Sequence, residues 1–154
     1  MPPRFTPDKR PSRFSEDPKV RGEPSHNDYT GSGYDRGHLA SNHVIGSFFG
    51  PQAQLESFMT THIIPQTPSL NRGGVWHELE RLEMGLGRAF GTVWIITGPV
   101  ETSLANQLSF GVSLPEGCFK IFADQTSNGW RLSAFLFTQN SRGGTLHTYA
   151  VPVD

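Results

Sequence analysis

The chain has 154 residues, which is enough for one domain with its own hydrophobic core, and no apolar run in it is long enough for a membrane span. Hydrophobic residues make up only 35%, while glycine (17) and proline (12) are abundant, so we expect a loop-rich mixed fold and exclude a helical bundle. The net charge of −1 offers no global attraction for a polyanion, and the single cysteine excludes an intrachain disulfide.

The N-terminal part of the chain is predicted to be irregular. Residues 1–27 are rich in proline, serine and charge, which is typical of an extended arm, and Phe5, Phe14 and Tyr29 are its expected anchors. The run DYTGSGY at 28–34 predicts a turn that leads into a short strand.

The middle of the chain contains the clearest helix signal. Between 75 and 88, Trp76, Leu79, Leu82 and Leu86 recur at spacings of three and four, which predicts one apolar helix face. Before this helix we expect an apolar run at 44–49, a short helix at 52–61, a strand at 62–66 that Pro65 ends, and a loop with helix-capping residues at 69–74.

The C-terminal part predicts a sheet. The expected strands are 92–97, stopped by Gly98-Pro99, then 119–123 and 132–137 with a turn at Asn128-Gly129, and last 146–153 with Pro152 at a sheet edge. Nothing suggests a linker, so residues 1–154 are predicted to form a single α+β domain with a central antiparallel or mixed sheet, flanking helices and long loops.

Four consecutive residues, Asp35-Arg36-Gly37-His38, carry chemistry that suits attack on a phosphodiester. His38 can accept a proton near neutral pH, and Arg36 can hold phosphate oxygens with its planar fork of donors. Gly37 allows a sharp backbone turn, and Asp35 can orient Arg36 or a neighbouring amide. A turn with a surface ion pair is the alternative interpretation of the same four residues.

Asn71 follows His38 by 33 residues and precedes the predicted helix. Its amide oxygen is a hard neutral ligand that Mg²⁺ accepts among several waters. Asparagine is also a good helix cap, so a capping role is the alternative.

With the tetrad and Asn71 in order, the chain resembles the sugar-non-specific DNA/RNA endonucleases, whose active site is a ββα-metal (His-Me finger) fold. The resemblance rests on ordered blocks from about residue 10 to the C-terminus: 28–40, 56–58, Pro65-Gln66, Leu70-Asn71, Trp76, Leu79-Glu80, 97–99, Phe119-Lys120, 134–137 and Gln139-Asn140. Both ends look short against the family.

The resemblance implies a catalytic role for each matched residue. His38 is the general base, Asn71 is the one direct protein ligand of Mg²⁺, and Glu80 reaches the ion through water. Arg36 and Asp35 complete the catalytic set, with Arg36 holding the histidine or the phosphate. Mn²⁺ or another divalent ion can substitute, and the products carry 5′-phosphates.

Further contacts with the substrate are expected from basic side chains. Arg10 and Arg13 flank the position of a phosphate-contacting residue of the family, and Arg72 extends a basic rim. The family usually has asparagine where this chain has His62. That imidazole either donates to phosphate or only satisfies its strand neighbours.

The spacing after the metal ligand also departs from the family. Trp76 follows Asn71 by five residues where four is usual, so we expect a bulge at Gly73-Gly74 that moves Glu80 out of its usual register.

Other prominent residues have structural interpretations. The three tryptophans and Cys118 are predicted to be core residues, and Glu78 and Glu83 are predicted to lie on a solvated helix face. The remaining histidines are predicted to be surface or packing residues: His26, His43, His77 and His147.

These features predict a metal-dependent, sequence-tolerant endonuclease acting on single- and double-stranded DNA and RNA. A catalytically weakened nucleic-acid-binding module of the same fold and a phosphodiesterase for small or lipid-linked substrates are the alternatives. A homodimer and an inhibitor protein are the further partners that the resemblance suggests, with no membrane partner. No targeting signal is present, and a secreted, periplasmic or mitochondrial location is expected over the cytosol, where such an enzyme is toxic.

Overall fold

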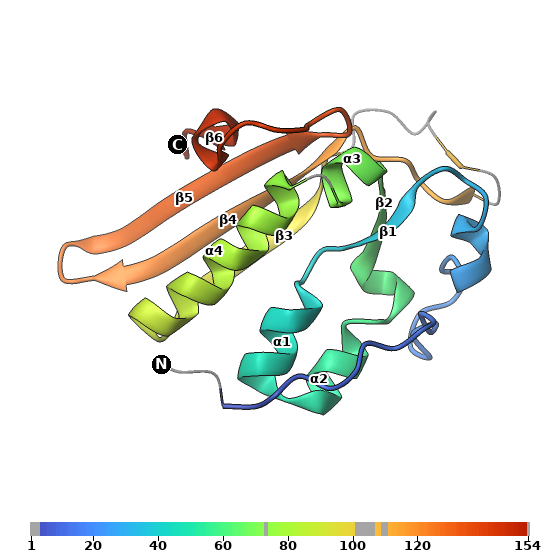
Figure 1. The fold of residues 1–154 in the computed structure, drawn as a ribbon, viewed down its shortest axis with the longest axis horizontal. Coiled ribbons are helices and arrows are strands. Elements are labelled where there is room, and N and C mark those ends of the chain that lie inside the picture. The colour runs from blue at the N-terminus through green and yellow to red at the C-terminus, as the bar shows by residue number, and fades with distance from the viewer. Residues whose placement is uncertain (1–3, 73, 101–106, 109–110, 154) are drawn as a thin grey trace.

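The computed structural model describes residues 4–72, 74–100, 107–108 and 111–153. The elements in chain order are a 3₁₀ turn (His26–Tyr29), β1 (Asp35–His38), α1 (Asn42–Phe49), α2 (Pro51–Glu56), a 3₁₀ turn (Thr60–His62), β2 (Ile63–Gln66), α3 (Pro68–Asn71), α4 (Val75–Phe90), β3 (Trp94–Val100), β4 (Gly117–Thr126), β5 (Gly129–Thr138), a 3₁₀ turn (Leu146–Tyr149) and β6 (Ala150–Val151). Helix α4 lies across a four-stranded antiparallel sheet of order β3-β4-β5-β6, and β1 pairs with β2 in a separate antiparallel sheet beside it (Figure 1). The predicted α+β class is confirmed.

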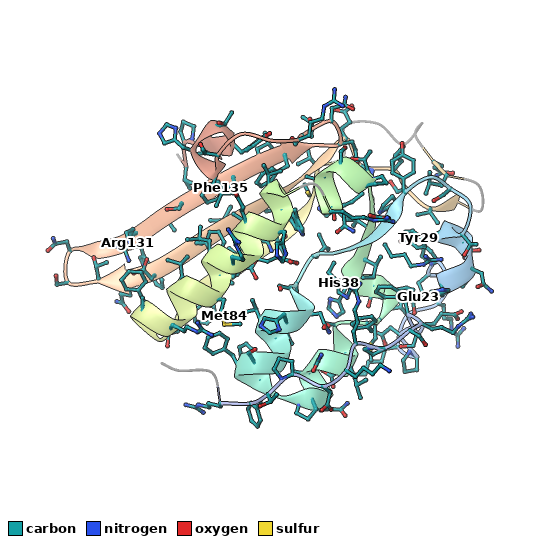
Figure 2. All side chains as sticks on the ribbon, in the orientation of Figure 1. Glu23, Tyr29, His38, Met84, Arg131 and Phe135 are labelled. Atoms are coloured by element: carbon teal, nitrogen blue, oxygen red, sulfur yellow. The ribbon has the colours of Figure 1, made fainter. Side chains whose placement is uncertain are left out.

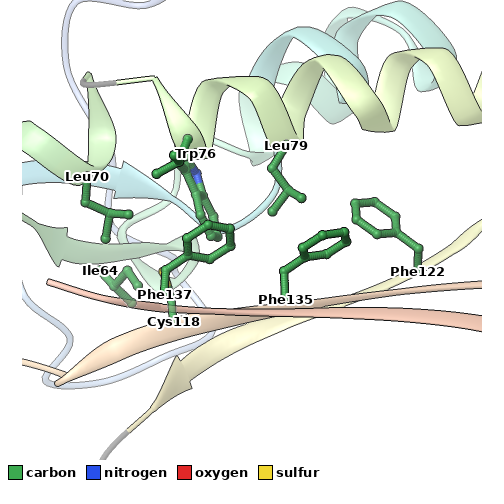
Figure 3. Close-up of a cluster of buried hydrophobic side chains, with 9 residues drawn as sticks. Ile64, Leu70, Trp76, Leu79, Cys118, Phe122, Phe135 and Phe137 are labelled. Atoms are coloured by element: carbon green, nitrogen blue, oxygen red, sulfur yellow. The ribbon is translucent and has the colours of Figure 1, made fainter. Parts of the chain in front are cut away.

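Helix α4 builds the main core, as its apolar spacing predicts. Trp76 and Leu79 are buried and face Phe122, Phe135 and Phe137 from β4 and β5 (Figure 3). The Trp76 and Phe137 rings meet edge to face, with centroids 5.7 Å apart. The helix therefore covers one face of the sheet and holds its own N-terminus above the β1–β2 pair.

The other face of the four-stranded sheet is open, and the prediction that every tryptophan is a core residue is wrong for two of them. Trp94 and Trp130 are 62% and 59% exposed, whereas Trp76 is buried. The two exposed rings alternate with core positions along their strands, so they project from the face that α4 does not cover.

Glu83 is also misplaced by the sequence-based prediction, which put it on a solvated helix face. It is buried and forms an ion pair with Lys120 of β4, which is itself fully buried. Glu83 lies four residues after Leu79 and so shares its core-facing side of α4. Burial raises the pKa of Glu83, while the Lys120 ammonium opposes that shift.

Two strands continue through the prolines that were expected to stop them. Strand β2 runs past Pro65 to Gln66, and β3 runs past Gly98-Pro99 to Val100. Each of these strands pairs on one side only, so the missing proline N–H leaves no ladder position empty on the other side.

The segments that flank the predicted active site are more helical and more broken than expected. The helix predicted at 52–61 ends at Glu56, because the chain then turns so that Met59 bridges to Ser15 of the arm. The loop predicted at 69–74 begins with α3, in which Leu70 N donates to the Thr67 side chain at 3.4 Å.

The last predicted strand, 146–153, is wrong except at Ala150–Val151. Leu146 and Tyr149 both pack on the main core, and a 3₁₀ turn places residues three apart on one side. The Tyr149 ring stacks on Phe137 at 4.9 Å.

The N-terminal arm is extended, as predicted, and runs beneath α1 and α2 toward β1 (Figure 1). Phe14 stacks on Phe58 at 4.7 Å and Tyr29 is buried, but Phe5 is 46% exposed and is a weak anchor. Within the described ranges, no helix has the length and apolar character needed to cross a membrane.

Candidate active site

His38 lies at the end of β1, where the strand runs into α1 (Figure 2). It is 7% exposed and packs between two rings, with centroid distances of 5.1 Å to Phe14 and 4.7 Å to Phe58. Burial, with smaller contributions from the charges of Arg10 and His62, lowers the pKa of His38 to about 3. The imidazole is therefore neutral at physiological pH and able to accept a proton.

Asn71 is presented to the site by Asp35. Its Nδ2 donates to Asp35 Oδ2 at 3.0 Å, and Arg72 holds the same carboxylate with a bidentate ion pair. Although burial opposes the shift, the bonds from Arg72 and Asn71 lower the pKa of Asp35. With Nδ2 so engaged, Asn71 Oδ1 is the atom left to accept a cation.

Asn71 does not cap α4, so the alternative role considered for it is wrong. The residue before that helix is Gly74, with φ of 119°, and no side chain caps the helix there. Asn71 instead ends α3, one of the elements that contact β1.

Glu80 faces the same space from the second turn of α4. Burial raises its pKa, against the attraction of Lys120 and His77, whose Nδ1 lies 3.6 Å from Glu80 Oε2. The expected displacement by the extra residue near Gly74 is not seen, because Glu80, His38 and Asn71 line one cavity of about 380 Å³.

Two of the predicted phosphate ligands also line this cavity, Arg10 and Arg72. Arg10 lies with its Cζ 5.4 Å from the centre of the Phe58 ring. Arg72 is exposed apart from its pair with Asp35, so its outer face remains open to solvent.

Arg36, Arg13 and His62 are not brought to the cavity. The Arg36 guanidinium donates to His26 O, at 2.6 Å from Nη2, and to Thr30 Oγ1, so it holds the preceding loop rather than phosphate. Arg13 donates to Asn27 Oδ1 at 3.3 Å. The His62 side chain is exposed beside a separate depression between α1 and α2.

The role expected of Asp35 toward Arg36 is likewise wrong, since Asp35 pairs with Asn71 and Arg72. Gly37 does not make a turn either, because it lies inside β1. A Cβ at Gly37 would lie 2.1 Å from Oε1 of Gln66, which is fully buried against this strand. Glycine is required there by that close approach.

Four lining residues were missed as site residues: Ser41, Asn42, His43 and His77. His43 and His77 are exposed, as expected of surface histidines, yet they border the cavity. Their positions carry a weak sequence signal, since His43 follows His38 by one helical turn and His77 precedes Glu80 by three residues.

The donor set fits a hard divalent cation. An amide oxygen and a nearby carboxylate are ligands that Mg²⁺ takes together with water. Across the described parts of the chain, no group of three or more His, Cys, Asp and Glu side chains is arranged to hold a metal, which is the arrangement zinc requires.

Comparison with known proteins gives a consistent result. A family model described as DNA/RNA non-specific endonuclease matches residues 4–154. The chain is 36% identical over 95 residues to human mitochondrial endonuclease G, covering 60% of this chain and 31% of that protein. It is 33% identical over 114 residues to a nuclease from Nostoc, covering 74% and 39%.

The fold is also matched by a solved structure, a complex of EndoG with its inhibitor EndoGI. The TM-score is 0.76 with 21% identity, over 94% of this chain and 65% of that one. The ββα-metal fold is thereby confirmed. The chain spans less than two thirds of this structure and less than a third of human endonuclease G.

Proposed function

Because the chain belongs to the DNA/RNA non-specific endonuclease family, we propose that it is a metal-dependent, sugar- and sequence-non-specific endonuclease. It hydrolyses phosphodiester bonds of DNA and RNA and leaves 5′-phosphates. The observation that carries this proposal is the convergence of His38, Asn71 and Glu80 on one cavity rimmed by arginines.

Each residue has a definite task in this reaction. The neutral His38 imidazole accepts a proton from the attacking water, since burial keeps the ring uncharged before substrate arrives. An incoming phosphate adds negative charge beside the ring and favours the protonated form that results. Arg10 and Arg72 hold the phosphate in position.

Asn71 Oδ1 would hold a Mg²⁺ ion directly, and Glu80 would hold it through water. When bound, the ion supplies charge neutralisation for the phosphate and the departing 3′ oxygen. Mn²⁺ or another hard divalent ion can take its place. Asp35 keeps the amide oriented, which is the task of an outer partner at a metal site.

Sequence tolerance follows from the same groups. The side chains in the cavity address phosphate, water and metal, and base edges are what would have to be contacted for sequence reading. Binding is therefore expected to weaken as salt rises.

Digestion of supercoiled plasmid and of RNA, with Mg²⁺ or with EDTA, tests the proposal. We expect cleavage of both polymers with Mg²⁺, none with EDTA, and a loss of about 10²–10⁴-fold in His38→Ala. Intact polymers with Mg²⁺ would contradict the enzyme proposal. Binding without cleavage would support a weakened binding module, and turnover of only a small chromogenic diester would support the small-substrate phosphodiesterase.

We further propose a protein inhibitor as a partner and an exported or mitochondrial location. The structural neighbour is a complex of EndoG with an inhibitor, and several relatives are named as mitochondrial nucleases. An enzyme that accepts any nucleic acid has to be separated or blocked from the cell's own.

A homodimer is proposed on the open face of the four-stranded sheet. Trp94, Ile96, Trp130, Leu132 and Leu136 project from this face and are 62%, 56%, 59%, 46% and 42% exposed. Side chains of this size expose roughly 500–600 Å² of apolar surface, which is large for one patch on a monomer. Two copies packed face to face would bury roughly 1,000–1,200 Å², near the lower limit of specific interfaces.

A further inference from the structure

A second cavity, of about 360 Å³, continues from the active-site cavity between α1 and α4. The two share Ser41, His43, His77 and Glu80 as lining residues. No residue considered in the catalytic scheme lies in the second cavity beyond Glu80. Its contents must therefore be explained separately.

The second cavity has an apolar floor and a cationic rim. Val44 from α1 and Met84 from α4 are buried beneath it, and Met84 lies on the side of α4 that faces α1 (Figure 2). Arg81 and Arg88 are exposed and line it from α4. The acidic Glu83 on the same helix turns inward to Lys120, so it does not neutralise this rim.

Gly85 is an independent sign that the space is kept open. It lies in the interior of α4, where glycine costs about 0.5–1 kcal/mol relative to alanine. A Cβ at Gly85 would meet nothing within 4 Å, so no packing contact accounts for the glycine. Gly87 differs, because a Cβ there would lie 2.9 Å from the Phe48 ring.

The dimensions suit a stretch of nucleic acid. Seven residues of helix separate Arg81 from Arg88, a rise of about 10 Å. That length corresponds to about three steps of a nucleic-acid strand at roughly 3.4 Å per step. An apolar floor fits sugars or bases, and arginines fit the phosphates that join them.

We propose that this groove binds the polynucleotide strand on one side of the bond to be cut, with Arg81 and Arg88 as phosphate ligands. This inference rests on the proposed endonuclease function and adds to it a reason for preferring polymers. A substrate with one phosphate reaches only the His38 cavity, whereas a polynucleotide gains contacts along α4.

The test compares the double variant Arg81→Gln/Arg88→Gln with a matched control, Arg21→Gln/Arg142→Gln. The control removes two exposed arginines that line neither cavity. Binding of a long single-stranded oligonucleotide is measured against salt in a His38→Ala background. The kcat/KM for that polymer and for a single-phosphate diester is measured in the active background.

We expect the groove variant to lower the slope of log affinity against log salt by about 1.4–1.8, since each lost phosphate contact removes about 0.7–0.9. The ratio of polymer to diester kcat/KM should fall about tenfold. Gly85→Leu, which fills the groove without altering charge, should lower the same ratio, and thermal unfolding checks that each variant is folded.

Equal slopes and equal ratios for the groove and control variants would overturn the groove while leaving the endonuclease proposal standing. Failure of the parent protein to bind or cut any polynucleotide would overturn both. Loss of the ratio in Gly85→Leu alone would contradict the phosphate roles of Arg81 and Arg88.

Discussion

Asp35 controls how the proposed metal ligand is presented, although it touches no substrate itself. It accepts from Asn71 Nδ2 at 3.0 Å and is held by Arg72. Without the carboxylate, the Asn71 amide can rotate and offer its NH₂ group to the cation in place of its oxygen.

We therefore predict that Asp35→Ala weakens Mn²⁺ binding by about 10–100-fold, the usual effect of losing an outer partner at a metal site. Titration calorimetry with Mn²⁺ on the folded protein measures this directly. Arg72→Gln separates the two functions of the carboxylate, because it removes the ion pair and keeps the bond to Asn71. Unchanged Mn²⁺ affinity in Asp35→Ala would show that Asn71 is positioned by other means.

His38 links the site to the stability of the fold. Its pKa falls from 6.5 in the unfolded chain to about 3 in the folded protein, mainly through burial. The unfolded state therefore binds the extra proton first, and the stability contributed by the neutral ring is lost as pH falls from 6.5 toward the folded pKa.

Urea unfolding in EDTA should show this dependence. The free energy of unfolding of the native protein, relative to His38→Gln, should fall by up to about 1.4 kcal/mol per pH unit between about pH 6 and pH 4. Parallel pH dependence in the two proteins would mean that the His38 ring is accessible to protons in the folded state.

At the residue scale, the sequence predicts which residues meet but not what each one contacts. The order His38, Asn71, Glu80 is readable because the ββα motif places them through the backbone. The contacts of Arg36 and Asp35 depend on side-chain partners from distant segments, Thr30 with His26 and Arg72 with Asn71. Local spacing carries no information about such choices.

At the scale of elements, α4 joins the core to the site. One side of it packs on β4 and β5 through Trp76 and Leu79, and Glu80 faces the cavity. The buried ion pair between Glu83 and Lys120 lies between these two regions, and Lys120 Nζ is also 4.6 Å from the centre of the Trp76 ring.

We predict that Lys120→Met destabilises the fold by about 3–5 kcal/mol, because Glu83 is left charged and buried without its partner. The loss should be smaller in acid, where Glu83 can take up a proton. Lys120→Met/Glu83→Leu should recover most of the stability in urea unfolding. A double variant no more stable than the single one would show that the pair contributes through its shape and not through its charge.

The regular parts of these elements could be predicted from the sequence, and the departures have physical causes. Helix α4 and strands β4 and β5 carry long periodic patterns that their packing preserves. The burial of Glu83 was missed because an acidic residue by itself predicts exposure, and only Lys120 on a strand 37 residues away reverses that. The segment 146–153 alternates like a strand, but its contacts with the core select a 3₁₀ turn.

At the scale of the whole molecule, one face of the sheet is covered and the other is open. The exposed Trp94 and Trp130 lie on the open face, away from the cavity that carries the chemistry. Association through this face would therefore leave the active site accessible.

Sedimentation at increasing protein concentration tests the proposed dimer. We predict a monomer–dimer equilibrium that Trp94→Ser/Trp130→Ser shifts to monomer, with little change in stability because both side chains are already exposed. A native protein that stays monomeric at every concentration would refute the dimer, and it would leave the catalytic proposal untouched.

The central claim is that Asn71 and His38 act together on a phosphodiester through a divalent cation. The most direct test is the rate of Mg²⁺-dependent nicking of supercoiled plasmid by the native protein and by Asn71→Ala, with circular dichroism confirming that both are folded. We predict that nicking by the folded Asn71→Ala variant is at least about a hundredfold slower across the Mg²⁺ titration. A folded Asn71→Ala variant that nicks plasmid at the native rate would contradict the account.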